Sequence, residues 1–95
     1  MKTLEEVKTT LSSKEFTNQV AEQNNISAAM TKKIIRQLKS ALKEFIEDED
    51  EEDVLDIFSD FITEDAPDYW EEMFEDEVED MNFAELGRNI EKILL

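Results

Sequence analysis

The segment from Glu44 to Asp80 constrains the fold most, because it is both strongly acidic and rich in large apolar residues. It holds 20 acidic side chains among 37 residues and no lysine or arginine, yet it also holds six of the chain's eight aromatic residues. Blocks of like charge are usually solvated and disordered, but such tails rarely contain aromatic residues. We therefore expect this segment to fold with its carboxylates at the surface, and only the unbroken acidic run 47–53 to be a solvated connector.

The spacing of apolar residues after the connector predicts helices. Five of them follow the i, i+3, i+4, i+7, i+8 pattern of one helical face: Val54, Ile57, Phe58, Phe61 and Ile62. Asp65 and Pro67 are typical of a helix start and predict a further helix, in which Trp70, Met73, Phe74, Val78 and Met81 recur at helical spacing. Asn82 with Glu85 predicts the capped start of a last helix.

The first half of the chain predicts a helical hairpin over residues 12–46. Ser12 or Ser13 is a suitable N-cap for its first helix, and Asn24-Asn25 is typical of a turn. Ser27 can cap a long second helix with a broad apolar face. Because the domain has little else to cover that face, we expect it to form a homodimer interface, made of Met30, Ile34, Ile35, Leu38, Leu42 and Phe45.

Together these patterns predict an all-α fold: one domain over residues 1–95, built as a small acidic bundle of about five short helices. The domain divides into the hairpin 12–46, the connector 47–53 and the acidic part 54–95. One glycine and one proline in 95 residues disfavour a sheet protein, which needs many turns.

The composition argues against several functions. The chain lacks cysteine and histidine and has no Gly-rich phosphate loop, so we expect no enzyme activity, no cofactor and no metal site. The acidic run 47–53 lacks the glycine that a calcium-binding loop requires at its turn. A net charge of −16 disfavours direct binding to nucleic acid or to an anionic membrane. With no secretory signal pattern and no membrane-spanning run, we expect a cytoplasmic protein whose partners are basic proteins.

The hairpin resembles the opening of the HU/IHF family of bacterial nucleoid proteins. The resemblance rests on the sequence Lys-Glu-Phe-Thr-Asn-Gln-Val-Ala-Glu at 14–22 and on Ile26-Ser27, and it covers residues 12–46. Fainter similarities follow, at 58–61 to the family's sheet, and at Phe83, Gly87 and 88–95 to its closing helix. The resemblance implies an alternative α+β fold, a diverged HU-like protein with a helical dimer base and truncated acidic sheet arms.

The departures from that family concern its DNA-binding surface. The family's sheet glycines and long basic arms are missing, and the acidic sequence 65–72 takes their place. In size, acidity and helix content the chain is similar to phage-encoded inhibitors of host DNA-binding proteins. The resemblance therefore suggests a DNA mimic that acts in host takeover by occupying HU, either by filling its DNA-binding saddle or by exchanging into its dimer.

Spacing of the carboxylates is consistent with DNA mimicry. Acidic side chains three or four residues apart on a helix stand about 5–6 Å apart, which produces rows of charge that a DNA-binding protein can accept. The predicted partner-binding residues are Asp53, Asp56, Asp60, Glu64, Asp68, Glu71, Glu72, Glu75, Asp76 and Glu79. The alternative function is an acidic regulatory or chaperone-like module that binds another basic partner, such as a restriction enzyme or a transcription factor.

Overall fold

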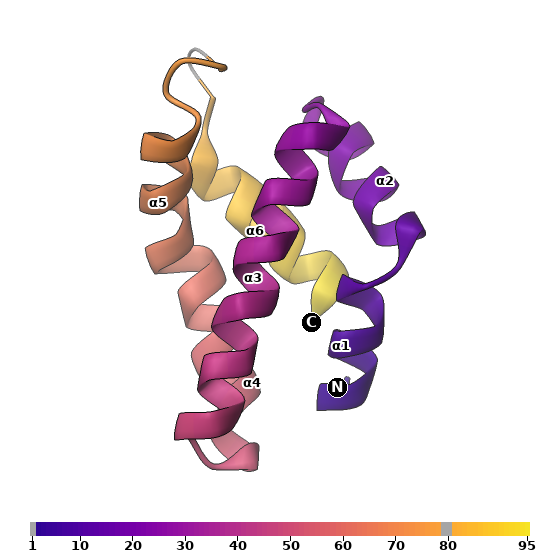
Figure 1. Cartoon of the computed structure of the whole chain (residues 1–95), viewed down its shortest axis with the longest axis vertical. Helices are drawn as coiled ribbons and strands as arrows, with labels where there is room; N and C mark the ends of the chain where they lie inside the picture. The colour runs from indigo at the N-terminus through magenta and orange to yellow at the C-terminus, as the bar shows by residue number, and fades with distance from the viewer. Residues whose placement is uncertain (1, 79–80) are drawn as a thin grey trace.

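The computed structural model describes residues 2–78 and 81–95, and all the regular structure in these two ranges is helical (Figure 1). The elements are α1 (Leu4–Leu11), α2 (Lys14–Asn24), α3 (Ala28–Asp48), α4 (Glu51–Asp60), the π-helical segment η1 (Phe61–Asp65), α5 (Ala66–Met73) and α6 (Phe83–Leu94). The all-α prediction is confirmed. The alternative with HU-like sheet arms is wrong for the described residues, because 54–78 is helical where that fold requires strands.

The predicted hairpin of α2 and α3 is present, with the predicted caps. The Oγ atom of Ser13 accepts a hydrogen bond from the Phe16 amide, and the Oγ atom of Ser27 accepts one from the Met30 amide, each at 3.1 Å. Asn25 ends α2 in the left-handed conformation, with φ 53° and ψ 48°. Asparagine tolerates this conformation better than most residues, so it reverses the chain at little cost.

A short helix that the sequence analysis did not predict, α1, precedes the hairpin. Thr3 and Glu6 form a reciprocal capping box at its start, and Val7 and Leu11 enter the core. The Nζ atom of Lys2 donates a 2.6 Å hydrogen bond to the carbonyl of Ile93, which ties the start of the chain to the last turn of α6. A lysine is well placed there, because the C-terminal carbonyls of a helix carry partial negative charge.

Helices α4, η1 and α5 form one continuous rod over residues 51–73, packed alongside α3 (Figure 1). This corrects one prediction. The connector 47–53 is largely helical, and only Glu49 and Asp50 separate α3 from α4. Acidic side chains at 51–53 are favourable in the first turn of a helix, where the backbone dipole is positive. Helix α5 begins at Ala66 with Pro67 in its first turn, as predicted, but no break separates it from η1, because the helical backbone already runs through Asp65.

The π-helical segment keeps one face of the rod turned to the core. Six buried residues form a stripe that recurs at every fourth position along the rod and ends at the residue after α5: Val54, Phe58, Ile62, Ala66, Trp70 and Phe74. Pro67, next to Ala66, is buried as well. On a regular α-helix each step of four residues overshoots a full turn by about 40°, so such a stripe would wind away from the core. The amide of Ala66 bonds to the carbonyl of Phe61, five residues earlier, and this wider turn reverses the drift. We call these six residues the core stripe.

Helix α6 lies directly on the rod at its π-helical segment. A Cβ atom at Gly87 would stand 2.5 Å from the carbonyl oxygen of Ile62 and 3.2 Å from Cγ of Pro67. Only a glycine therefore allows the two backbones to approach this closely. On its other side, α6 contacts α2, where Asn89 Nδ2 donates to Asn24 Oδ1 at 2.9 Å.

The apolar face of α3 is buried within the chain, which corrects the assignment of that face to a dimer interface. Met30, Ile34, Ile35, Leu38 and Leu42 are at most 6% exposed, and Phe45 is half-buried against Phe61. The helices that cover this face are α2 and the rod, although we expected little else in the domain to be available for this. A homodimer remains a prediction, but these six residues no longer support it.

Trp70 is the largest side chain of the core, and it is fully buried. Its indole Nε1 donates a 2.6 Å hydrogen bond to Oε1 of Gln37 on α3, so the ring is buried with its polar atom satisfied.

Of the helices in 2–78 and 81–95, none combines the length and the apolar character needed to cross a membrane.

The contact at Gly87 predicts that Gly87→Ala destabilises the fold. Alanine favours a helix over glycine by up to about 1 kcal/mol, but overpacking against a backbone atom costs typically about 1–3 kcal/mol and here falls at the upper end. We expect the melting temperature to fall by about 5–15 °C in a thermal scan followed by circular dichroism. Ala84→Gly, at an exposed position of the same helix, is the control for helix propensity alone. A melting temperature that rises in Gly87→Ala would contradict the close approach of α6 to the rod.

Candidate protein-binding surface

A row of carboxylates runs along the rod on the side opposite the core stripe. These residues also recur at every fourth position, and all are exposed: Glu52, Asp56, Asp60, Glu64, Asp68 and Glu72. Each lies two residues from a core-stripe position, which is about 200° of rotation on an α-helix. We call this row the acidic ridge. The wide turn of η1 that keeps the core stripe facing inward keeps the ridge facing outward for the same reason.

The predicted partner-binding residues map onto this surface. Asp56, Asp60, Glu64, Asp68 and Glu72 belong to the ridge itself. Asp53 and Glu71 are exposed beside it on the rod, and Glu75 and Asp76 are exposed in the turn after α5. Glu79 lies outside the described residues. The structure adds Glu52, which stands one turn before Asp56 and therefore extends the row to the start of α4.

The ridge carboxylates make no ion pair with any lysine or arginine in the part of the chain that the structure describes. The two ion pairs found there join Lys8 to Glu5 at 3.6 Å and Lys33 to Glu77 at 3.8 Å, and all four side chains are at least half exposed. Exposed pairs of this kind contribute little to stability. The ridge is therefore an uncompensated line of negative charge that is free to meet a cationic partner.

An aromatic hollow lies beside the ridge, between α3 and the rod. It has a volume of about 390 Å³ and is lined by Gln37, Ser40, Ala41, Glu44, Phe45, Phe61, Asp65 and Tyr69. The rings of Phe45 and Phe61 meet edge to face, with centroids 5.8 Å apart. Tyr69 is 53% exposed and Met73, one turn further along, is 46% exposed. Exposed aromatic and methionine side chains are frequent anchors in protein interfaces.

Periodicity alone did not distinguish these exposed anchors from core residues. Trp70 and Phe74 are buried, as is usual for aromatic residues at helical spacing, whereas their neighbours Tyr69 and Met73 are not. The available signal was the four-residue recurrence of the core stripe, which includes 70 and 74 and excludes 69 and 73.

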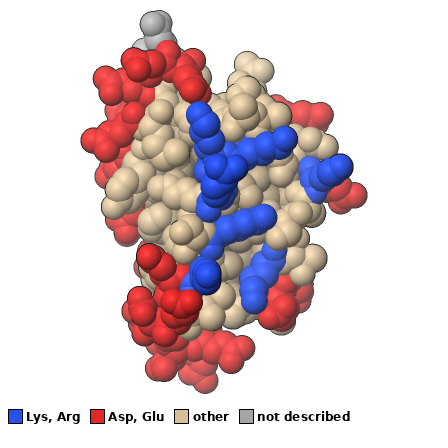
Figure 2. All heavy atoms as spheres, viewed as in Figure 1, with Lys and Arg blue, Asp and Glu red and all other residues tan. Residues whose placement is uncertain are grey.

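Basic side chains occupy a different surface. Figure 2 shows lysines and arginines gathered along the middle of one face, over α3, with acidic side chains along the edge formed by the rod. The exposed cations of α3 are Lys32, Lys33, Arg36, Lys39 and Lys43. The segregation of charge along the sequence therefore becomes a segregation of faces in the fold.

Carboxylates are numerous, but in 2–78 and 81–95 no three of them converge closely enough to hold a metal ion. On the rod they point outward from a convex helix, and such an arrangement provides rows of charge rather than a coordination shell. The chemistry that the surface offers is electrostatic attraction together with apolar contact at Tyr69 and Met73.

No protein-family model, characterised protein or solved structure matches this chain. The resemblance of residues 12–46 to the HU/IHF family accordingly stays a prediction.

Repulsion along the ridge predicts an unusual response to salt. Like charges four residues apart on a helix destabilise it by about 0.2–0.5 kcal/mol per pair, and the ridge contains a run of such pairs. We expect added salt to raise the melting temperature, because it screens exposed charges. The triple variant Asp60→Asn, Glu64→Gln, Asp68→Asn should melt about 4–10 °C higher than the wild type at low salt and should respond less to salt.

The matched control for this experiment removes three exposed acids from α1 and α2 instead: Glu5→Gln, Glu15→Gln and Glu22→Gln. It makes the net charge less negative by the same three units and leaves the ridge unchanged. Equal effects of the two triple variants would show that total charge, and not the ridge, sets the salt response.

Proposed function

We propose that this protein is a DNA mimic that binds a basic DNA-binding protein and blocks its access to DNA. The observation that carries the proposal is the acidic ridge, an uncompensated row of carboxylates held along one rigid rod. It supplies the regular charge that a phosphate-binding surface recognises.

The density of charge on the rod supports this proposal. Residues 51–73 extend over about 34 Å, at about 1.5 Å per residue, and carry ten exposed carboxylates without a basic residue. That is about one negative charge per 3.4 Å, the spacing of phosphates along the axis for one strand of B-DNA. The length of the rod is also close to one turn of the double helix, about 34–36 Å.

The fixed position of the charges is a second support. The core stripe anchors the opposite face of the same rod, so the ridge carboxylates have a folded backbone behind them. A partner therefore does not have to order a flexible acidic tail when it binds. Preorganisation of this kind reduces the entropic cost of association.

The choice of target rests on a separate argument. HU is our favoured partner, because residues 12–46 resemble its family and because it is a basic protein that grips DNA in the cytoplasm. The mechanism we favour is occupation of the DNA-binding saddle by the ridge, because exchange into the HU dimer would require the apolar face of α3, which is buried.

An acidic regulatory or chaperone-like module for another basic partner is the second candidate. The aromatic hollow with Tyr69 favours it, because DNA mimicry alone does not require an apolar anchor. On this alternative the ridge steers a cationic partner and the hollow determines which partner binds.

A competition assay tests the proposal. Fluorescently labelled DNA is bound to HU at about 0.1 M salt, where charges within about 10 Å still interact, and this protein is added. We expect the anisotropy of the DNA to fall to its free value as HU is captured. The ridge triple variant should require at least about tenfold more protein, because each lost carboxylate removes a contact to a cationic surface. The control triple variant on α1 and α2 should behave like the wild type.

The outcomes separate the hypotheses. If this protein releases another DNA-binding protein from DNA but does not release HU at any concentration, HU is excluded as the target and the DNA-mimic hypothesis is retained. Failure to release any DNA-binding protein, while a basic protein is still bound, would support the second candidate. In that case Tyr69→Ala should weaken binding more than the ridge variant does.

A further inference from the structure

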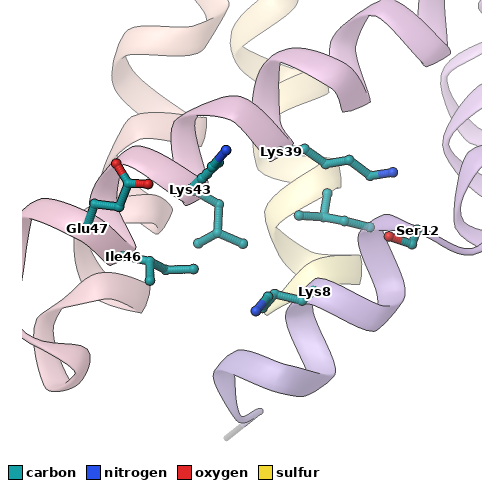
Figure 3. Close-up of a pocket in the computed structure, with 8 residues that line it drawn as sticks. Lys8, Ser12, Lys39, Lys43, Ile46 and Glu47 are labelled. Atoms are coloured by element: carbon teal, nitrogen blue, oxygen red, sulfur yellow. The ribbon is translucent and has the colours of Figure 1, made fainter.

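The structure contains a second surface that DNA mimicry does not use, a groove between α1 and the C-terminal half of α3. Its volume is about 430 Å³, and its surface is mainly apolar. The residues that line it are Lys8, Leu11, Ser12, Lys39, Leu42, Lys43, Ile46 and Glu47. Figure 3 shows Lys8 on one side and Lys39 and Lys43 on the other, with Ile46 between the two helices at one end of the groove.

The floor and walls of the groove are suited to a hydrocarbon chain. Leu11 and Leu42 close the floor, since they are only 2% and 3% exposed. Ile46 is 36% exposed and is one of three large apolar residues in the described part of the chain that remain exposed. The methylene stems of the three lysines add further apolar surface at the sides.

The rim of the groove is cationic, in contrast to the molecule as a whole. Lys39 and Lys43 are one turn apart on α3 and therefore share a face, while Lys8 stands across from them on α1. Lys8 has an ion-pair partner in Glu5, but at 3.6 Å and with both side chains exposed this pair is weak. At physiological salt the Debye length is about 8 Å, so an anion in the groove responds mainly to these ammonium groups rather than to the distant ridge.

The size of the groove decides between a small ligand and a protein segment. A standard protein interface involves about 20–30 residues on each side, whereas eight residues line this groove. Small-molecule sites have volumes of about 300–1,000 Å³, and the groove falls within that range. We infer that this groove binds an anionic amphiphile, a molecule with a carboxylate head and a hydrocarbon chain. The head lies among Lys8, Lys39 and Lys43, and the chain lies on Leu11, Leu42 and Ile46.

The inference is tested with decanoate, added below its aggregation concentration to the isotope-labelled full-length protein. We expect saturable NMR shift changes at Leu11, Leu42 and Ile46, with one decanoate bound per chain. Decanol, which has the same chain without the charge, should bind at least about tenfold more weakly. The double variant Lys39→Met, Lys43→Met should weaken the binding of decanoate about tenfold and leave the binding of decanol unchanged. Glu47→Gln should instead strengthen the binding of decanoate, because it removes a negative charge from the groove.

The matched control is Lys14→Met with Lys32→Met, which removes two exposed cations outside the groove and should leave decanoate binding unchanged. Far-UV circular dichroism establishes that each variant keeps its helix content. The inference is wrong if decanoate produces no saturable shifts at the groove, or if decanol binds as tightly. It is also wrong if an acidic amphipathic peptide occupies the same groove more tightly than decanoate, because the site would then accept a protein segment.

Discussion

The approach of α6 to the rod at Gly87 is the contact on which the arrangement of the molecule depends. The Ile62 carbonyl and the Pro67 ring leave no room for a Cβ atom, so α6 can lie on the rod only where its single glycine meets the π-helical segment. Around this contact α6 packs on η1 and α5, its residues Leu86 and Ile90 are buried, and α2 contacts α6 through the Asn24–Asn89 hydrogen bond. The same segment sets the rotation of both ends of the rod, and therefore the direction in which the acidic ridge points.

The two sides of the rod have opposite effects on the stability of the fold. One side buries six residues and holds the chain together, while the other carries unpaired carboxylates that repel one another. Apolar burial is worth roughly 25 cal/mol per Å² and outweighs surface repulsion, which is weak in water and is reduced further by salt. The fold can therefore maintain a line of like charge at its surface as long as the opposite face stays packed, so the acidic ridge and the stability of the fold are linked through the same rod.

Some of the architecture could be predicted from the sequence. The hairpin was predictable because Ser13 and Ser27 cap helices through local hydrogen bonds and Asn25 adopts the left-handed conformation, and sequence motifs report both directly. Helix α1 carries an equally local signal in its capping residues Thr3 and Glu6. The continuous rod was harder to predict, because Pro67 normally marks the start of a separate helix, whereas here the π-helical segment joins α5 to α4 without a break. The ridge carboxylates were predictable in type and spacing, whereas Tyr69 and the groove at Lys39 depend on which helices become neighbours.

The link between α3 and the rod has a consequence for how the molecule approaches other molecules. Only Glu49 and Asp50 separate the two helices, so a helix with five exposed cations lies alongside one with ten exposed carboxylates. Such an arrangement gives the molecule a permanent electric dipole across its width. In the field of a cationic surface the dipole experiences a torque, which turns the rod toward that surface before the two molecules touch. Rotational search is thereby shortened, and the molecule arrives with its ridge in front.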